Sequence, residues 1–554
     1  MTNPHDWNSL APHFEVLETA PLSLSTARTW LQSWSDLDSS ISEVTSRAYR
    51  ARMEDTTNQL AEATYMNLIE NVIPKVETAK NALEKRFAAL EGNNDPETLE
   101  FYKRIKASLA IFAEKNIALG VAVSKLEVQY DKLMGDLNIS INGEELTIYA
   151  ASAKLLEPNR ALRQEVYQAL IAAWQKIRPQ LETMFLELLR LRRQMAKNAG
   201  LENYREFTWQ AKARFDYTPA DCFLFHNSIL EQVVPLAQKA FAKRRETMQL
   251  ATLRPWDAAV NPSGLEPLRP FSNATELETQ IQAIFSSLSP DFGQMFSTMR
   301  QNNLDLDSRK GKGPGGYCDF FTQSGQAYIF MNAVGTQDDI QTMLHEGGHA
   351  FHALESYQAQ KLVWNYHGPM EFCEVASMGM EMLAMPYLDQ SLGGMYTTAQ
   401  AKRATSEHLF DAVLVFLPYM ACVDAFQHWL YVDAPDDVSI HTINAKWAEL
   451  YQTFLPHLDF RGIEDGMAFR WQRQSHIFTA PFYYIEYGIA QVGAIQVWQN
   501  ALENQPQAIQ KYRQALRLGG TKGLRELFAA AGLELNFDSS HIAGLMKIVE
   551  AALD

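Results

Sequence analysis

The chain has 554 residues, of which 47% are hydrophobic and 21% are charged. This length exceeds the ~250–300 residues at which single cores begin to divide, so we expect at least two lobes with conventional cores. The formal net charge of −16 argues against nucleic-acid binding, which needs clustered lysine and arginine side chains.

The sequence predicts neither a secretory signal nor a membrane anchor. Residues 1–7 have no basic stretch followed by an apolar one. The most apolar run, residues 412–423, contains Pro418 and is much shorter than the ~20 residues that span a bilayer. Four widely spaced cysteines suit reduced thiols, and we assign them no metal. We therefore expect a cytoplasmic protein without membrane contact.

Helical periodicity dominates the first part of the chain, from residue 22 to 137. Alternating residues then flank Asn142-Gly143, a pair that favours the two-residue turn of a hairpin. A long helix rich in leucine and arginine is predicted over residues 159–198. Thr218 and Asp221, with a proline between them, predict a capped helix start. A proline-rich loop follows at residues 253–270.

The pattern changes at residues 316–331, where two aromatic and β-branched runs are separated by Ser324-Gly325. These runs predict a pair of strands. Beyond Thr336 the helical pattern returns and continues to the end of the chain. The fold class expected from these patterns is mainly α with a small β-sheet.

The run His345-Glu346-Gly347-Gly348-His349 carries the chemistry. Thr336 and Asp339 predict a helix cap just ahead of it, so both histidines lie within a helix. A separation of four residues places both imidazoles on one face, where they can bind one metal ion with Glu346 beside the bound water. Each glycine costs a helix ~1 kcal/mol relative to alanine. We therefore expect that a neighbouring element approaches closely here.

Catalytic zinc commonly has two histidines, a carboxylate and an open position for water. A metzincin is excluded, because His352 and Glu355 stand where its glycine and third histidine would be. Glu355 is too near on the same helix to be the third ligand. Three candidates remain on a following apolar helix, namely Glu371, Glu374 and Glu381, and their spacing alone does not choose among them.

Residues 345–352, His-Glu-Gly-Gly-His-Ala-Phe-His, and residues 371–381, Glu-Phe-Cys-Glu-Val-Ala-Ser-Met-Gly-Met-Glu, resemble the thimet oligopeptidase and oligoendopeptidase F family of zinc metallopeptidases. The resemblance implies one Zn²⁺ per chain, with Glu374 as its third ligand. It also implies that Glu381 orients a zinc-bound histidine, as carboxylates around such sites do.

The same resemblance extends to residues 470–487. It implies that His476, Tyr484 and Tyr487 stabilise the tetrahedral intermediate, with Tyr483 as an alternate that contacts substrate. Phenol and imidazole donors aimed at a developing oxyanion lower a barrier by ~3–4 kcal/mol each in comparable sites.

The resemblance further implies a gluzincin-type fold, with two helical lobes that enclose a deep channel and a small sheet beside the histidine helix. The strand from Tyr328 to Met331 resembles the edge to which an extended peptide adds, so Tyr328 is predicted to bind substrate. We expect an N-terminal helical region at 1–137, a hairpin and long helix of the oligoendopeptidase N-terminal type at 138–200, and the catalytic region at 201–554.

The function predicted from these residues is a zinc-dependent oligoendopeptidase that hydrolyses short peptides, with Glu346 as general base. One alternative is a zinc carboxypeptidase, in which Arg470 or Arg473 would bind the substrate carboxylate, although we expect a structural ion pair for both. The second alternative is a peptide-binding protein that has lost hydrolysis. The intact Glu346 argues against it, because a binding protein has no use for the base.

Overall fold

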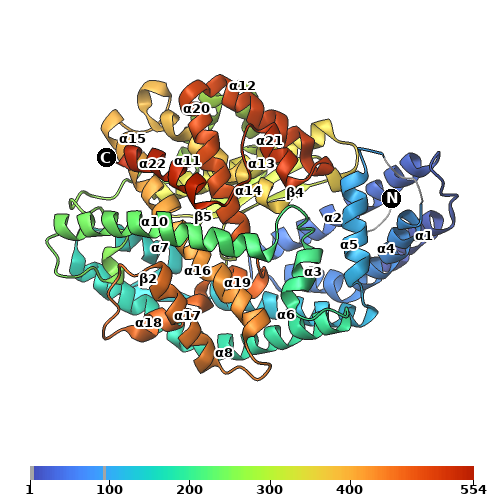
Figure 1. The fold of residues 1–554 in the computed structure, drawn as a ribbon, viewed down its shortest axis with the longest axis horizontal. Coiled ribbons are helices and arrows are strands. Elements are labelled where there is room, and N and C mark those ends of the chain that lie inside the picture. The colour runs from blue at the N-terminus through green and yellow to red at the C-terminus, as the bar shows by residue number, and fades with distance from the viewer. Residues whose placement is uncertain (1–4, 91–94, 554) are drawn as a thin grey trace.

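The computed structural model describes residues 5–90 and 95–553. It is mainly α, with two small sheets (Figure 1), as predicted. The N-terminal helices gather at one end of the molecule, and the C-terminal helix α22 lies toward the other. Residues 1–4, which begin the stretch predicted to lack a secretory signal, lie outside the described residues.

The first six helices form the N-terminal part of the fold. A separate hydrophobic cluster holds α1, α2, α4 and α5 together around Trp30, Trp34, Phe87 and Phe101. The ring of Trp364, far along the chain, stacks on Phe101 with centroids 3.9 Å apart, which ties this cluster to the rest of the protein. The six helices are α1 (Trp7–Thr19), α2 (Ala27–Glu54), α3 (Gln59–Asn67), α4 (Ile73–Ala88), α5 (Leu99–Ile111) and α6 (Glu114–Gly135).

The predicted hairpin and long helix are both present. Strands β1 (Asn138–Ile141) and β2 (Glu144–Thr147) pair antiparallel, and Asn142 and Gly143 between them both have positive φ angles, as a tight hairpin turn requires. Helix α8 (Arg160–Asn198) follows and is capped by Asn159. The two strands and the first turns of α8 share one hydrophobic cluster.

The remaining helices build the larger part of the molecule, and all but the short helix Ile148–Ala153, which packs with the hairpin, contribute to one extended core. Helix α10 begins with the predicted capping box of Thr218 and Asp221. These helices are α7 (Ile148–Ala153), α9 (Tyr204–Ala211), α10 (Pro219–Thr247), α11 (Ala274–Leu288), α12 (Pro290–Met299), α13 (Gln337–Ala359), α14 (Met370–Ala384), α15 (Thr398–Leu409), α16 (Phe416–His428), α17 (Ile440–Phe454), α18 (Glu464–Ala468), α19 (Ser475–Thr479), α20 (Tyr484–Leu518), α21 (Leu524–Ala530) and α22 (Ser539–Leu553).

In the part of the chain that the structure describes, one helical stretch, Thr398–Asp433, is long and apolar enough to cross a membrane. The bent pair α5 and α6 would be a second if it were one span. In Thr398–Asp433, 61% of the most apolar window is buried inside the protein. Residues 412–423 thus contribute to the core, as the sequence predicts.

The second sheet lies beside the histidine helix and has three strands, β3 (Leu304–Asp307), β4 (Tyr317–Phe321) and β5 (Gln326–Ala333). Its order is β3-β5-β4. The predicted pairing of β4 with β5 is confirmed as antiparallel, whereas β3, which pairs parallel to β5, was not predicted.

The prediction that the strand Tyr328–Met331 is a free edge is wrong. Strand β5 is central, so both of its sides are already hydrogen-bonded. Tyr328 is fully buried, its hydroxyl donates to Glu54 on α2 at 2.9 Å, and the Arg50 guanidinium covers its ring. These contacts leave Tyr328 no surface for substrate, so it is a residue that joins the sheet to α2.

Helices α13 and α14 pack at unusually short range. A Cβ atom at Gly348 would lie 2.4 Å from the Ala376 carbonyl oxygen and 2.5 Å from the Ser377 Cα atom. At Gly347 a Cβ atom would lie 2.4 Å from the Phe285 ring. The close approach expected from the two glycines is therefore present, and at Gly348 it is made by the backbone of α14.

Gly348→Ala is expected to force these two backbones apart, because neither partner atom belongs to a flexible side chain. Overpacking of this kind typically costs ~1–3 kcal/mol, which thermal unfolding will detect as a lower midpoint. Gly379→Ala on α14 is the matched control, since its Cβ atom would meet only the Tyr512 and Val497 side chains at 3.4 Å or more. Equal midpoints for the two variants would contradict the close backbone contact.

Candidate metal centre and active site

The two histidines of the motif lie in the third turn and the fourth turn of α13. The helix starts with a capping box in which Thr336 and Asp339 bond each other's backbone amides, so its register is fixed from the first turn. The rings of His345 and His349 are 5.0 Å apart between centroids. Each side chain keeps 19% of its surface exposed, so solvent reaches this face of the helix.

Glu374 on α14 lies with the two histidines in a three-residue group that could hold a metal ion. Its Oε2 atom lies 3.3 Å from His345 Nε2 and 3.3 Å from His349 Nε2. Two ligand atoms that each lie ~2.0–2.1 Å from a tetrahedral zinc ion are ~3.3–3.4 Å apart. Burial alone raises the pKa of Glu374, but the two histidines hold that pKa well below its usual value. These residues fit Zn²⁺ in donor type and in spacing.

The structure gives the other carboxylates different partners. Glu371 accepts a hydrogen bond of 2.5 Å from Tyr217 and faces Arg214. Glu355 is held by Arg513 and Arg517. Among the described residues, only Glu374 of the candidate carboxylates joins the two histidines in a cluster of metal-binding type.

Glu381 lies behind His345, as the family resemblance implies. Its Oε1 atom is 2.6 Å from His345 Nδ1, which fixes the ring so that Nε2 faces the metal position. Its other oxygen lies 3.1 Å from His408 Nε2. Burial raises the pKa of Glu381, yet His345 and His408 outweigh burial and lower it.

Glu346 follows His345 and is buried, with 5% of its surface exposed. Its Oε2 atom has no hydrogen-bond partner within the described residues. Burial raises the pKa of this carboxyl group, although the neighbouring histidines oppose that effect. The carboxylate is thus close to the metal position and free to bind a water molecule.

A cluster of ring donors faces the metal site from α19 and the start of α20. The Tyr483 hydroxyl donates to Glu374 Oε1 at 2.5 Å, and Ser377 donates to Glu374 Oε2 at 2.9 Å. His476 Nε2 lies 3.1 Å from the Tyr487 hydroxyl. Burial lowers the pKa of His476 to about 4, so its ring is neutral at pH 7.

The rings of the two predicted tyrosines of α20, Tyr484 and Tyr487, both pack on His476 and on each other. Tyr487 is within the electrostatic reach of Glu374 and Glu346. Tyr484 instead packs on Tyr419 and is influenced by Arg470. An oxyanion role thus stays a prediction for both tyrosines.

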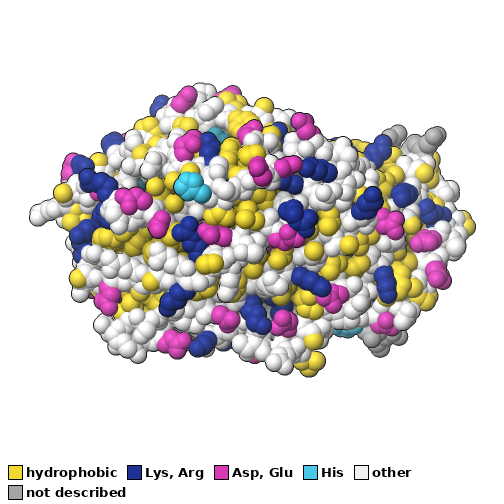
Figure 2. All heavy atoms as spheres, turned by 90° about the horizontal axis from the view of Figure 1, so that it is seen from below, with side chains coloured by type: hydrophobic (Ala, Val, Ile, Leu, Met, Phe, Trp, Pro, Cys, Tyr) yellow, Lys and Arg dark blue, Asp and Glu magenta, His cyan; other side chains and the backbone are white. Residues whose placement is uncertain are grey.

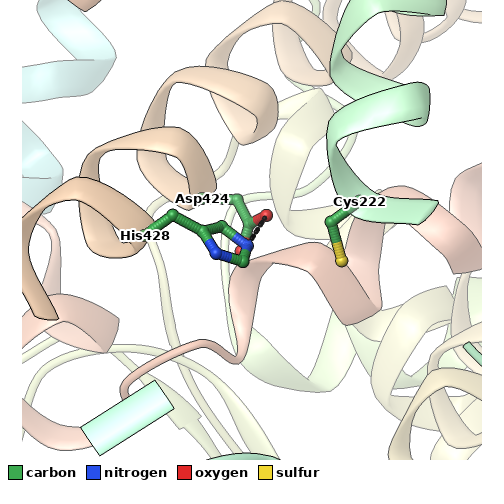
Figure 3. A group of neighbouring side chains, drawn as sticks. All are labelled: Cys222, Asp424 and His428. Atoms are coloured by element: carbon green, nitrogen blue, oxygen red, sulfur yellow. Dashed lines mark ion pairs between the residues drawn. The ribbon is translucent and has the colours of Figure 1, made fainter. Parts of the chain in front are cut away.

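A second cluster, drawn in Figure 3, also has residues of metal-binding type: Cys222 on α10 with Asp424 and His428 on α16, all buried. Asp424 Oδ2 lies 2.9 Å from His226 Nε2 and 3.2 Å from His428 Nε2. His428 Nδ1 faces the Arg205 guanidinium at 3.4 Å. Because an arginine can only donate, Nδ1 accepts and the proton lies on Nε2, where a metal would have to bind. This cluster is a hydrogen-bonded carboxylate that joins two helices.

Two contacts of the site were not predicted from the sequence. Ser377 lies three residues after Glu374 on the same helix face, a spacing that could have indicated it. His408 lies on a different helix, α15, and no local motif marks it.

The Peptidase family M3 model matches residues 154–546. The chain belongs to this peptidase family. The plasmid-encoded oligoendopeptidase F of Lactococcus lactis subsp. cremoris is 21% identical over 394 residues, which cover 71% of this chain and 63% of that protein. The group B oligopeptidase of Streptococcus agalactiae is 19% identical over 418 residues, 74% of this chain and 66% of that protein. The chain thus spans slightly less than two thirds of these relatives.

Two solved structures resemble this protein over nearly its whole length. Pz peptidase A, solved with an inhibitor, superposes with a TM-score of 0.93 and 26% identity, covering 100% of this chain and 98% of that one. Oligoendopeptidase F from Enterococcus faecium has a TM-score of 0.66 and 14% identity, with 99% and 96% coverage. The second likeness concerns the fold alone.

Replacement of Glu374 by alanine is expected to remove most of the bound zinc, because it deletes the one carboxylate that touches both histidines. Glu371→Ala is the matched control, since Glu371 lies one helical turn away on α14 and is also buried. Zinc per chain is measured by mass spectrometry of the purified proteins. Equal zinc content in the two variants would contradict Glu374 as a ligand.

Proposed function

We propose that this chain is a zinc-dependent oligoendopeptidase that hydrolyses internal bonds of short peptides. The observation that carries the proposal is the spacing of 3.3 Å between Glu374 and each histidine, with an unpartnered Glu346 carboxylate beside them. Membership in peptidase family M3 supports the same activity.

His345, His349 and Glu374 would hold one Zn²⁺ ion. When bound, the ion polarises the scissile carbonyl and lowers the pKa of a bound water to ~7. Glu381 keeps the His345 ring in one tautomer and one orientation through its contact with Nδ1. Tyr483 and Ser377 bond the Glu374 carboxylate, so its position does not depend on the metal alone.

Glu346 is the proposed general base. Its Oε2 atom accepts the proton of the attacking water, and the same carboxyl group then donates this proton to the leaving amine. Burial raises its pKa, which makes proton transfer in both directions easier near neutral pH. The reaction needs no covalent intermediate with the protein.

His476 and Tyr487 are proposed to donate hydrogen bonds to the oxyanion that forms during attack. Both groups are neutral at pH 7, since burial lowers the pKa of His476 and raises that of Tyr487. A neutral donor in a dry site needs little rearrangement when the charge develops. Tyr483, which contacts Glu374, is proposed to contact substrate as well.

The proposed substrates are oligopeptides. The carboxylates of the site are almost fully buried, while the two histidines remain partly exposed. The opening through which a substrate would reach the site is therefore narrow. Two helical lobes with a deep channel between them would exclude folded proteins. An extended peptide would add along β4, which is one of the two edge strands and whose preceding Gly316 lies beside Glu346.

Two other functions remain distinguishable by experiment. A carboxypeptidase would remove C-terminal residues one at a time, and a peptide-binding protein would leave peptides intact. Mass spectrometry of peptides incubated with the zinc-loaded protein separates these outcomes, since an endopeptidase gives internal cuts.

Glu346→Gln is expected to lower kcat by at least ~1,000-fold, because it removes the base but keeps the shape of the side chain. Zinc content should remain near one per chain, since Glu346 is not a ligand. Peptide cleavage and zinc are measured on the same preparation. A fully active Glu346→Gln protein would refute this mechanism.

A further inference from the structure

Arg470 and Arg473 are two positively charged side chains without a carboxylate partner. They lie on the short 3₁₀ turn Arg470–Arg473, immediately ahead of the helix that carries His476. In the described chain, no Asp or Glu oxygen lies within 4 Å of either guanidinium, and the buried Nε atom of Arg470 has no hydrogen-bond partner. The structural ion pair expected for these residues is therefore absent.

Three arginines that are more deeply buried than this pair do have such partners. Arg163 lies 3.0 Å from Asp257, Arg214 lies 2.7 Å from Glu486, and Arg52 lies 2.7 Å from Asp131. An unpaired buried charge is costly to a fold. The half-buried Arg86, Arg104, Arg205 and Arg244 also lack a carboxylate, but each bonds to a carbonyl oxygen or an imidazole. Arg470 and Arg473 have neither kind of acceptor, which points to a partner that the described residues do not supply.

Aromatic side chains surround the pair. The Arg470 guanidinium carbon lies 5.9 Å from the Tyr419 ring and 5.8 Å from the Tyr451 ring, and that of Arg473 lies 5.7 Å from the Trp174 ring. Burial and the charge of Arg470 lower the pKa of Arg473 to about 10, as expected for two like charges with no anion between them. Both side chains are only half-buried, so solvent or a ligand can reach them.

The pair is connected to the active site through one layer of side chains. The Tyr419 hydroxyl donates to Gln474 at 3.1 Å, and the Gln474 amide nitrogen lies 2.8 Å from His476 Nδ1. The Tyr484 ring contacts both Tyr419 and His476, with centroid distances of 5.8 Å and 5.3 Å.

We propose that Arg470 and Arg473 bind the C-terminal carboxylate of the peptide substrate. Guanidinium groups match a carboxylate in charge and in the geometry of their donors. Since neither arginine touches a metal ligand, the carboxylate is held away from the cut bond, and the cleavage leaves a C-terminal product longer than one residue. The arginines thereby fix the number of residues between the cleaved bond and the C-terminus of the peptide. This inference rests on the proposed peptidase function.

Three matched peptides test the site. The first peptide has a free C-terminal carboxylate and the second has a C-terminal amide. The third also has the amide, but one internal glutamine of the common sequence is replaced by glutamate, which returns a negative charge away from the C-terminus. We expect the unmodified protein to cleave the first peptide with a kcat/KM about 10- to 100-fold above that of the second, the range of charge-assisted hydrogen bonds.

In the Arg470→Gln and Arg473→Gln variants, kcat/KM for the peptide with a free carboxylate should fall far more than kcat/KM for the amidated peptide. The ratio of the two values then approaches one. Arg461→Gln is the control, because Arg461 is an exposed arginine of the same region that pairs with Asp459, and it should keep the full ratio. A merely structural role would lower both peptides equally, and that result would overturn the proposal. A preference that follows the internal glutamate would overturn the assignment to the C-terminus.

Binding separates this proposal from the proposed function. The zinc-loaded Glu346→Gln protein is titrated with the acid and amide peptides in a calorimeter, with and without Arg473→Gln. Tighter binding of the acid, lost in the double variant, supports the carboxylate site even if no peptide is hydrolysed. Equal affinity for both peptides would overturn the carboxylate site whatever the activity.

Discussion

The contact between α13 and α14 is the constraint on which the active site depends. Only a glycine at position 348 lets the backbone of α14 approach this closely. That approach brings Glu374 to 3.3 Å from both histidines, a separation that suits a single zinc ion. The start of α20 then completes the arrangement, because Tyr483 bonds the outer oxygen of Glu374. A wider helix pair would separate the carboxylate from the imidazoles and break up the proposed ligand set.

Buried charges in this protein fall into two groups. Most are balanced within the fold, as Glu381 is by two histidines and as Asp424 is by His226 and His428. Such clusters pair opposite charges and join helices. Arg470 and Arg473 lack a carboxylate in the described chain, and Glu346 keeps one oxygen without a partner. In a low-dielectric environment a charge without a partner gains from a ligand that supplies one.

The N-terminal helix α2 contacts the sheet that lies beside the histidine helix. Helix α2 reaches the sheet at Tyr328, whose hydroxyl donates to Glu54, and Glu43 accepts from the backbone amides of the turn between β4 and β5. The sheet is thus held between α2 on one side and the histidine helix on the other. On the face drawn in Figure 2, acidic and basic side chains are interspersed, so a net charge of −16 is not gathered into one patch there.

The sequence by itself determined the features that depend on neighbours along the chain. The capped histidine helix, the Asn142-Gly143 hairpin and the pair of strands at 317–333 all follow from local hydrogen bonding and periodicity. Residue spacing could not choose Glu374 over Glu371, and the choice came from family resemblance. The tertiary structure distinguishes the two physically, since Glu374 lies 3.3 Å from both histidines whereas Tyr217 and Arg214 contact Glu371. The strand order, the contact of His408 and the unpaired arginines were equally beyond local patterns, because they arise where distant segments pack together.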